Sequence, residues 1–234
     1  TQKKNRSNRK FMIKIIPAVI PQNLDIVRER FGKVLGLVEK VQMDIVDGDY
    51  APVKTWPFVD KNSKDLMRLV HGEEKFPYID DFVLEVDMLI KHPIEYISDF
   101  ILIGAKSFVV HIDSDDNLKE CIEIIKNAEC QIGLGIKPSG DISLLESFLP
   151  QADFVQFMGN DRVGYNGVEL DENVLIKISE FHKKYPSIPI QIDIGVNEET
   201  IPRLKEAGVS HFISGSAIFN APDIKEALTK LQSL

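Results

Sequence analysis

Cysteine and tryptophan are rare in this chain of 234 residues, which contains two cysteines and one tryptophan. A disulfide-stabilised scaffold needs more cysteines than Cys121 and Cys130, and no Cys-x-x-Cys or Cys/His spacing indicates a zinc site. Long apolar runs are also absent: no window approaches the roughly 18 consecutive apolar residues that a membrane-spanning helix requires. We therefore expect a soluble protein of a reducing compartment, the cytoplasm, with no membrane contact.

Positive charge is in short supply outside the first ten residues. The chain has 28 Lys and Arg against 36 Asp and Glu, and residues 1–10 hold five of the basic residues and no acid. The remainder is therefore strongly acidic and would repel a phosphate backbone, which argues against nucleic acid as a partner. Since 44% of the residues are hydrophobic and 27% charged, the chain as a whole is not disordered. We expect residues 1–11 to be a disordered basic tail or a cloning remnant, and 12–234 to form one catalytic domain.

Short β-branched segments alternate with longer amphipathic ones along the whole chain. We expect strands over residues 12–16, 41–46, 82–87, 107–112, 131–136, 153–157, 189–194 and 210–214. We expect helices over residues 23–38, 63–71, 93–104, 116–128, 141–149, 171–184, 197–207 and 223–233. This alternation predicts an α/β protein with parallel strands, and eight such units match a single (β/α)8 TIM barrel. A doubly wound open sheet is the alternative, although it usually begins with a glycine-rich loop that this chain lacks.

Polar side chains alternate with apolar ones on several of these strands. Gln42 and Asp44 lie on the second strand, Asp87 ends the third, and Asp193 lies on the seventh. In a barrel, alternate side chains point inward, and chemistry collects at the carboxyl ends of the strands. Three converging carboxylates repel one another unless they bind a cation or take up a proton, and either remedy indicates a functional site. The alternative is that each Asp caps a loop or the following helix.

Glycines gather near the ends of the last three predicted strands. They are Gly164 and Gly167 in VGYNGVEL, Gly195 in DIGVN and Gly215 in SGSAIF. Backbone N–H groups at such turns bind anions, and barrels of this type often hold a phosphate group after strands seven and eight. The placement favours a phosphate site over glycines that only make tight turns.

Six motifs give the chain a resemblance to one family. They are MDIVDGDYAP (43–52), EVDMLIKHPIEYI (85–97), VVHID (109–113), VGYNGVEL (163–170), IDIGVNEETI (192–201) and ISGSAIF (213–219). From about residue 13 onward the chain resembles the ribulose-phosphate 3-epimerases, barrel enzymes of pentose phosphate metabolism that interconvert ribulose 5-phosphate and xylulose 5-phosphate. The allulose-phosphate epimerases share these motifs.

The resemblance implies a metal-assisted proton transfer through an enediolate. In the family, two Asp act as acid and base on opposite faces of C3, and Asp44 and Asp193 match them. The phosphorylated ketose would be the partner, and a homo-oligomer is possible. We expect the following residues to bind substrate or phosphate: Lys137, Gly164, Tyr165, Asn166, Gly167, Gly195, Gly215 and Ser216.

The chain departs from the family pattern at several site positions. Gln42 and Asp87 stand where the family has its two metal-binding histidines, and Ala18 stands where it has a substrate-contacting serine. Further changes are Val46 for Met, Val163 for Pro, Ile194 for Gly and Lys137 for Asn. Metal ligation by Gln42, Asp44, Asp87 and Asp193 would be all-oxygen, which suits Mg²⁺ or Mn²⁺ better than Zn²⁺. We therefore expect an epimerase-like isomerase with an altered metal preference.

Two alternatives remain open at this point. Lys137 could form a Schiff base with a carbonyl substrate or pair with Asp87 in a metal-independent enzyme, or it could bind phosphate or neutralise the acids. The chain lacks the Asp-x-Lys-x-x-Asp signature of neighbouring decarboxylases and synthases. The second alternative is a catalytically inactive barrel that binds sugar phosphates, because the chain has lost both histidines and the serine.

Overall fold

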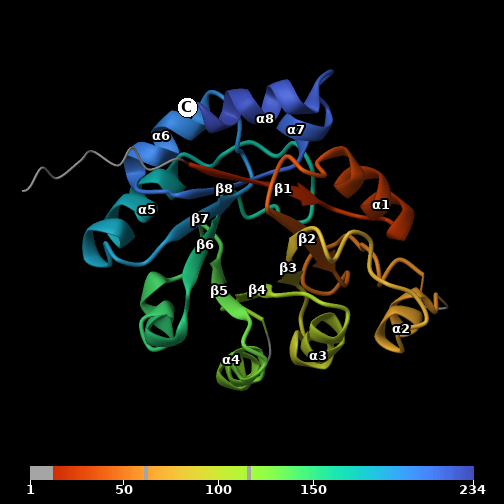
Figure 1. Ribbon diagram of the computed structural model, residues 1–234. Coiled ribbons are helices and arrows are strands. Elements are labelled where there is room, and N and C mark those ends of the chain that lie inside the picture. The colour runs from red at the N-terminus through yellow and green to blue at the C-terminus, as the bar shows by residue number, and fades with distance from the viewer. Residues whose placement is uncertain (1–12, 61–62, 115–116) are drawn as a thin grey trace, which may run out of the picture.

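Eight parallel strands pair in chain order, and the last pairs with the first, so the sheet closes into a barrel with the helices outside it (Figure 1). This is seen in a computed structural model that describes residues 13–60, 63–114 and 117–234. The strands are β1 (Lys14–Val19), β2 (Lys40–Val46), β3 (Val83–Leu89), β4 (Ser107–His111), β5 (Gln131–Ile136), β6 (Phe154–Met158), β7 (Ile190–Asp193) and β8 (His211–Ser214). The predicted (β/α)8 barrel is confirmed and the open sheet is wrong. The predicted tail, residues 1–11, lies outside the described residues.

The helices follow the predicted segments with two differences. They are α1 (Leu24–Lys33), α2 (Asp65–Val70), α3 (Ile94–Leu102), α4 (Leu118–Asn127), α5 (Asn173–Lys184), α6 (Thr200–Ala207), α7 (Ser216–Phe219) and α8 (Ile224–Gln232). The helix expected over 141–149 is instead two short 3-10 turns, Ile142–Leu145 and Leu149–Gln151. Pro150 lies in the second of these turns. The four-residue helix α7 was not predicted, because it is too short to show a helical period.

Local signals in the sequence fix where the helices begin and end. The Asn23 side chain accepts a hydrogen bond from the backbone N–H of Ile26 at 3.0 Å, and Asp223 caps Glu226 in the same way at 2.9 Å. Gly208 ends α6 with a φ of +114°, a conformation that favours glycine. These caps leave the apolar face of each helix free to pack against the outer face of the barrel, where the main core lies.

The inside of the barrel is polar at the level of Glu85. Glu85 on β3 accepts hydrogen bonds from Gln42 Nε2 at 3.3 Å, Gln191 Nε2 at 2.8 Å and Ser107 Oγ at 2.6 Å, and it forms an ion pair with Lys40. Because a buried carboxylate is costly without partners, this set of contacts is what allows Glu85 to be fully buried there.

Gln156 on β6 links that level to the carboxyl ends of the strands. Its Oε1 accepts from Gln42 Nε2 at 2.9 Å and from Gln191 Nε2 at 2.7 Å, while its Nε2 donates to Asp87 Oδ2 at 2.7 Å. Side chains from β2, β3, β6 and β7 therefore meet inside the barrel, as the alternating sequence pattern predicted for Gln42 and Asp87.

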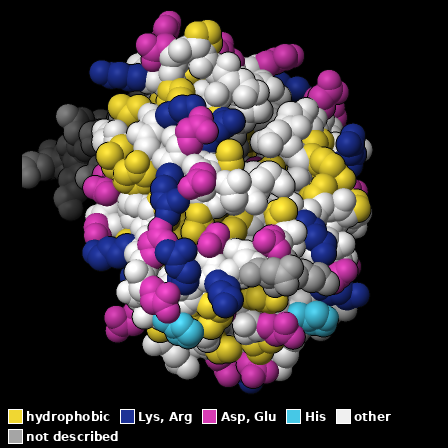
Figure 2. Space-filling view, turned by 90° about the vertical axis from the view of Figure 1, so that its right-hand side faces the viewer, with side chains coloured by type: hydrophobic (Ala, Val, Ile, Leu, Met, Phe, Trp, Pro, Cys, Tyr) yellow, Lys and Arg dark blue, Asp and Glu magenta, His cyan; other side chains and the backbone are white. Residues whose placement is uncertain are grey.

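Acidic and basic side chains are interspersed on the face shown in Figure 2. Within the described ranges, no helix is both long and apolar enough to cross a membrane.

Candidate active site

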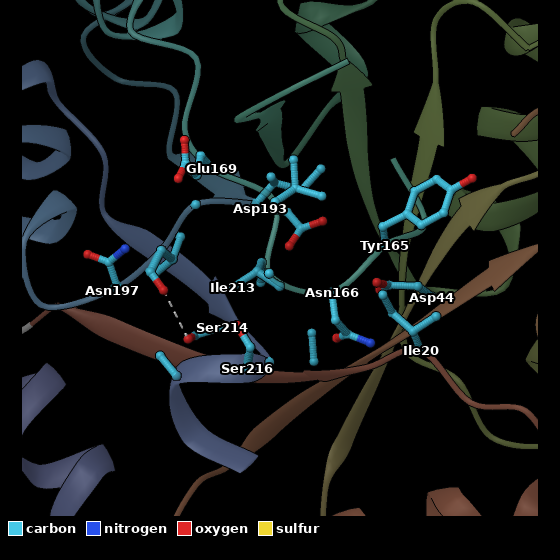
Figure 3. Close-up of a pocket in the computed structure, with 18 of the residues that line it drawn as sticks. Ile20, Asp44, Tyr165, Asn166, Glu169, Asp193, Asn197, Ile213, Ser214 and Ser216 are labelled. Atoms are coloured by element: carbon cyan, nitrogen blue, oxygen red, sulfur yellow. Dashed lines mark hydrogen bonds between the residues drawn. The ribbon is translucent and has the colours of Figure 1, made fainter. Parts of the chain in front are cut away.

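A cavity of about 450 Å³ opens at the carboxyl ends of β1, β2, β7 and β8. Asp44 and Asp193 line it together with the loop after β6, the turn after β7 and the start of α7 (Figure 3). This is the end of the barrel where the sequence predicted the chemistry to lie. Of the predicted site residues, Gln42, Asp87 and Lys137 do not line the cavity.

Asp44 is held at the inner wall of the cavity by its place on β2. Asp44 is only 3% exposed, and its Oδ1 has no hydrogen-bond partner among the described residues. Burial, followed by repulsion from Asp193, Asp87 and Glu85, raises the pKa of Asp44 well above its usual range. The side chain therefore holds its proton more firmly than an ordinary carboxyl group does.

Asp193 ends β7 and reaches the same cavity from another part of the barrel wall. Burial and the neighbouring Asp87 raise the pKa of Asp193 to about 7, although the backbone N–H of Ile194 acts in the opposite direction. The backbone of Ile194 has a φ of +74°, which is an uncommon conformation for a β-branched residue.

The predicted phosphate-binding glycines all line this cavity. All of the following line it: Gly164, Tyr165, Asn166, Gly167, Gly195, Gly215 and Ser216. Gly195 has a φ of +74°, and a Cβ there would lie 2.7 Å from the backbone N of Leu170. Close by, Ser214 Oγ donates to the Val196 carbonyl at 3.4 Å, the dashed line in Figure 3. The structure therefore brings these residues together as predicted, and their role in binding phosphate stays a prediction.

Both carboxylate oxygens of Asp87 contact neighbours inside the protein. Its Oδ1 lies 2.8 Å from His111 Nε2, and its Oδ2 accepts the hydrogen bond from Gln156. All three residues are fully buried. Asp87 thus uses both of its oxygens in contacts that leave it turned away from the cavity lining.

The four predicted metal ligands do not fit a divalent cation together. Asp87 has both oxygens engaged, and Gln42 is drawn toward Glu85 and Gln156 by its Nε2, although its Oε1 has no partner. Across residues 13–60, 63–114 and 117–234, no group of three or more His, Cys, Asp or Glu is placed to hold a metal ion. Only Asp44 and Asp193 remain open to the cavity, so the expected Mg²⁺ or Mn²⁺ centre is not assembled by these side chains.

Lys137 lies over the mouth of the barrel beside the cavity. Its Nζ is 3.0 Å from Asp113 Oδ2 and 3.9 Å from the centre of the Tyr50 ring, and the Tyr50 hydroxyl donates to Asp113 Oδ1 at 2.6 Å. Although burial alone would raise the pKa of Asp113, these two hydrogen bonds lower it. Burial and its bond to Asp113 raise the pKa of Tyr50. Lys137 is therefore already paired, and a Schiff-base role would first require it to leave Asp113.

Three residues of this region were not predicted from the sequence. His111 appeared only within the motif VVHID (109–113), and neither Gln156 nor Tyr50 was assigned to the site. A usable signal existed for Gln156, since it interrupts the apolar strand FVQFM in the middle. No local signal in the loop after β2 identifies Tyr50 as the partner of Asp113, because the contact spans 63 residues.

The chain is thus a closed (β/α)8 barrel in which two carboxyl groups and several glycines line one cavity at the carboxyl ends of the strands. Comparison with known proteins identifies the family. The chain matches the Ribulose-phosphate 3 epimerase family over residues 14–219 and therefore belongs to it.

Curated relatives agree with this assignment, and solved structures agree with the fold. The chain is 26% identical to the ribulose-phosphate 3-epimerase of Bacillus subtilis over 94% of this chain and 99% of that protein. It is 24% identical to the Escherichia coli enzyme of the same name over 94% of each. In fold it is similar to 3-hexulose-6-phosphate synthase from Salmonella typhimurium, with a TM-score of 0.66 at 18% identity over 94% and 97% of the two chains. A 3-keto-L-gulonate-6-phosphate decarboxylase from Vibrio cholerae gives a TM-score of 0.65 at 15% identity over 95% and 97%.

Proposed function

We propose that this protein is an isomerase that interconverts D-ribulose 5-phosphate and D-xylulose 5-phosphate, or a close analogue, by moving a proton at C3. One observation carries the proposal: the carboxyl groups of Asp44 and Asp193 come from β2 and β7 and line the same cavity. Epimerisation needs one group to remove a proton from one face of C3 and a second to return a proton to the other face. Two carboxyl groups on different sides of one cavity supply both.

The surroundings of the two carboxyl groups support the different protonation states that this reaction needs. The pKa of Asp44 is well above its usual range and that of Asp193 is about 7, in both cases chiefly through burial. Near neutral pH the pair can therefore hold one proton between them. The ionised carboxyl group takes the C3 proton and the protonated one supplies a proton from the opposite face, so the roles exchange in the reverse direction.

The substrate keeps the electron pair of the broken C–H bond as an enediolate of C2 and C3. Return of a proton to the face opposite the departure inverts C3, and both carboxyl groups end the turnover with their protonation states exchanged. Residues with raised pKa values are suited to this task, because an ordinary Asp is too weak a base at neutral pH.

The glycine side of the cavity supports a phosphorylated substrate. Gly195, Gly215 and Ser216 place backbone in the wall, where no side chain at either glycine blocks close approach. A Cβ at Gly215 would lie 3.0 Å from the Ala18 carbonyl, so the backbone there is packed as well as open to the cavity. Backbone N–H groups in such turns bind phosphate oxygens. A cytoplasmic setting and a homo-oligomer remain predictions.

The alternative of an inactive sugar-phosphate binder is weakened by the same carboxyl groups. A barrel that only binds a ligand gains nothing from two buried acids whose repulsion opposes folding. Lys137 offers no independent route, because it is paired with Asp113 outside the cavity lining.

The test is proton exchange at C3 in D₂O, followed by ¹H NMR with ribulose 5-phosphate. We expect the C3–H signal to disappear while xylulose 5-phosphate forms, and we expect unphosphorylated ribulose to exchange far more slowly. Binding of ribulose 5-phosphate with no exchange at C3 would contradict the proposal and favour the non-catalytic barrel. Binding of neither sugar phosphate would point to a different substrate.

A further inference from the structure

Two buried acids inside the barrel have polar partners among their neighbours. Glu85 forms an ion pair with Lys40, and Asp87 lies 2.8 Å from the Nε2 of His111. Asp87 is also the acceptor of Gln156 at 2.7 Å. Because a buried charge is tolerated only when it is paired and hydrogen-bonded, these contacts assign Glu85 and Asp87 to the framework of the barrel.

The packing around the His111 ring holds it in place beside Asp87. A Cβ at Gly135, the neighbouring position on β5, would lie 2.5 Å from His111 Nδ1. The missing side chain of Gly135 therefore makes room for the imidazole ring. On another side the ring contacts Tyr50, with ring centres 5.4 Å apart.

Because Asp87 does not line the cavity, it would have to turn away from both partners to reach a cation bound there. His111 and Gln156 are fully buried, so each would be left with an unpaired polar atom and no water to replace the lost contact. Gln42 does not line the cavity either, and its Nε2 is held by Glu85 and Gln156. Asp44 and Asp193 are the two predicted ligands that open on the cavity, and a hard divalent ion held by two carboxyl groups must take most of its ligands from water, so it would be bound weakly.

We propose that the mouth of this barrel holds no divalent cation, and that Asp87, His111 and Gln156 form a fixed hydrogen-bonded unit in its place. The inference rests on the proposed function only for the identity of the substrate. Asp44 and Asp193 then carry out proton transfer without a metal ion, while Asp87 stays bound to His111 and Gln156.

Direct titration of the full chain with Mn²⁺, followed by electron paramagnetic resonance, tests this without reference to activity. We expect Asp44→Asn and Asp87→Asn to bind as much Mn²⁺ as the wild-type protein does. The double variant Gln42→His/Asp87→His places imidazoles at both positions, and we expect it to gain one site and the visible absorption of bound Co²⁺. If that variant does not fold, the wild-type titration decides alone.

One Mn²⁺ per wild-type chain that is lost in both Asp44→Asn and Asp87→Asn would overturn the proposal. Asp25→Asn is the matched control, because the Asp25 side chain is 86% exposed on α1. Bound Mn²⁺ that persists in Asp44→Asn and Asp87→Asn lies elsewhere on the surface and leaves the proposal standing.

Exchange at C3 in the presence of EDTA separates this inference from the proposed function. Exchange that is unchanged by EDTA supports both. Exchange that appears only after Mg²⁺, Mn²⁺ or Zn²⁺ is added supports the function and overturns the metal-free mouth. No exchange under any condition, together with no bound Mn²⁺, overturns the proposed function and supports the inference about the metal.

Discussion

Ile194 follows Asp193 directly and has a φ of +74°, so a β-branched residue in the left-handed region sets the end of β7 where a carboxyl group enters the cavity. The resemblance places a glycine at this position. Ile194 also packs against an apolar cluster that contains Val46 and Val163, two other positions at which the chain departs from the family pattern. Strain of this kind gathers at functional sites when the surrounding packing is strong enough to hold it.

The strain at Ile194 can be measured by comparing two truncations. Ile194→Gly and Ile194→Ala lose the same packing, but only glycine adopts a positive φ without cost. We expect the Gly variant to be more stable than the Ala variant by about 1 kcal/mol, the reverse of the usual order. Urea denaturation of both variants measures the difference. A more stable Ala variant would show that this backbone is unstrained.

Gly195 is predicted to be irreplaceable for a second reason besides its φ. An added Cβ would lie 2.7 Å from the backbone of Leu170, whereas a Cβ at Gly167, which has a φ of +70°, would meet nothing within 4 Å. We expect Gly195→Ala to lower the free energy of unfolding by about 1–3 kcal/mol more than Gly167→Ala does. We also expect it to weaken binding of inorganic phosphate, measured by calorimetry. Equal effects of the two variants would contradict the close packing.

Asp193 should destabilise the fold increasingly as the pH rises. Its pKa is about 7 in the folded protein against an unfolded value of 3.8, so between these values the folded state binds more protons. Stability therefore falls as pH rises from about 4 to about 7. We expect Asp193→Asn to raise the free energy of unfolding by about 1–3 kcal/mol at pH 8, and by little at pH 4. A stabilisation that does not change with pH would show that burial does not perturb this carboxyl group.

His211 should produce the opposite dependence at the other end of the barrel. Burial, with help from Lys14 and Lys40 and against Glu85, lowers its pKa from 6.5 to about 4. Below about pH 6.5 the unfolded chain takes up a proton that the folded protein refuses, so stability is lost as pH falls toward 4. We expect wild-type protein to lose about 1–3 kcal/mol over this range relative to His211→Gln.

An exposed histidine supplies the control for that comparison. The His71 side chain is 61% exposed, so His71→Gln should follow the wild-type profile. Urea denaturation at pH 4, 5, 6 and 7 measures all three proteins. Identical profiles for wild type and His211→Gln would contradict the burial effect.

The sequence predicted the barrel and most of the cavity because both follow from short-range patterns. The period of two along β2 and β7 placed Asp44 and Asp193 on the inward face, and the glycines marked the turns that surround them. The contacts of Asp87 inside the barrel could not be predicted in this way. Asp44 and Asp87 are register partners on β2 and β3, so they are equivalent by pattern, and only contacts with His111 and Gln156, 24 and 69 residues away, separate their roles.

Two segments differ from the pattern that the sequence predicted. The segment 141–149 has helical spacing, but two short 3-10 turns replace the expected helix. The first strand was expected over 12–16, whereas β1 extends to Val19 and includes Pro17, which pairs in register with Ser214 on β8. A proline has no N–H for a sheet, so sequence patterns do not favour it within a strand.

The central claim is that Asp44 and Asp193 together move the C3 proton of a ketose phosphate. The most direct measurement is the rate of deuterium incorporation at C3 of ribulose 5-phosphate in wild-type protein, Asp44→Asn and Asp193→Asn, with binding of the sugar phosphate measured in parallel. We predict that each substitution slows the reaction by about 10²–10⁴-fold, the usual worth of a general acid or base, while binding is largely kept. Unchanged turnover in both variants would contradict the two-carboxylate account.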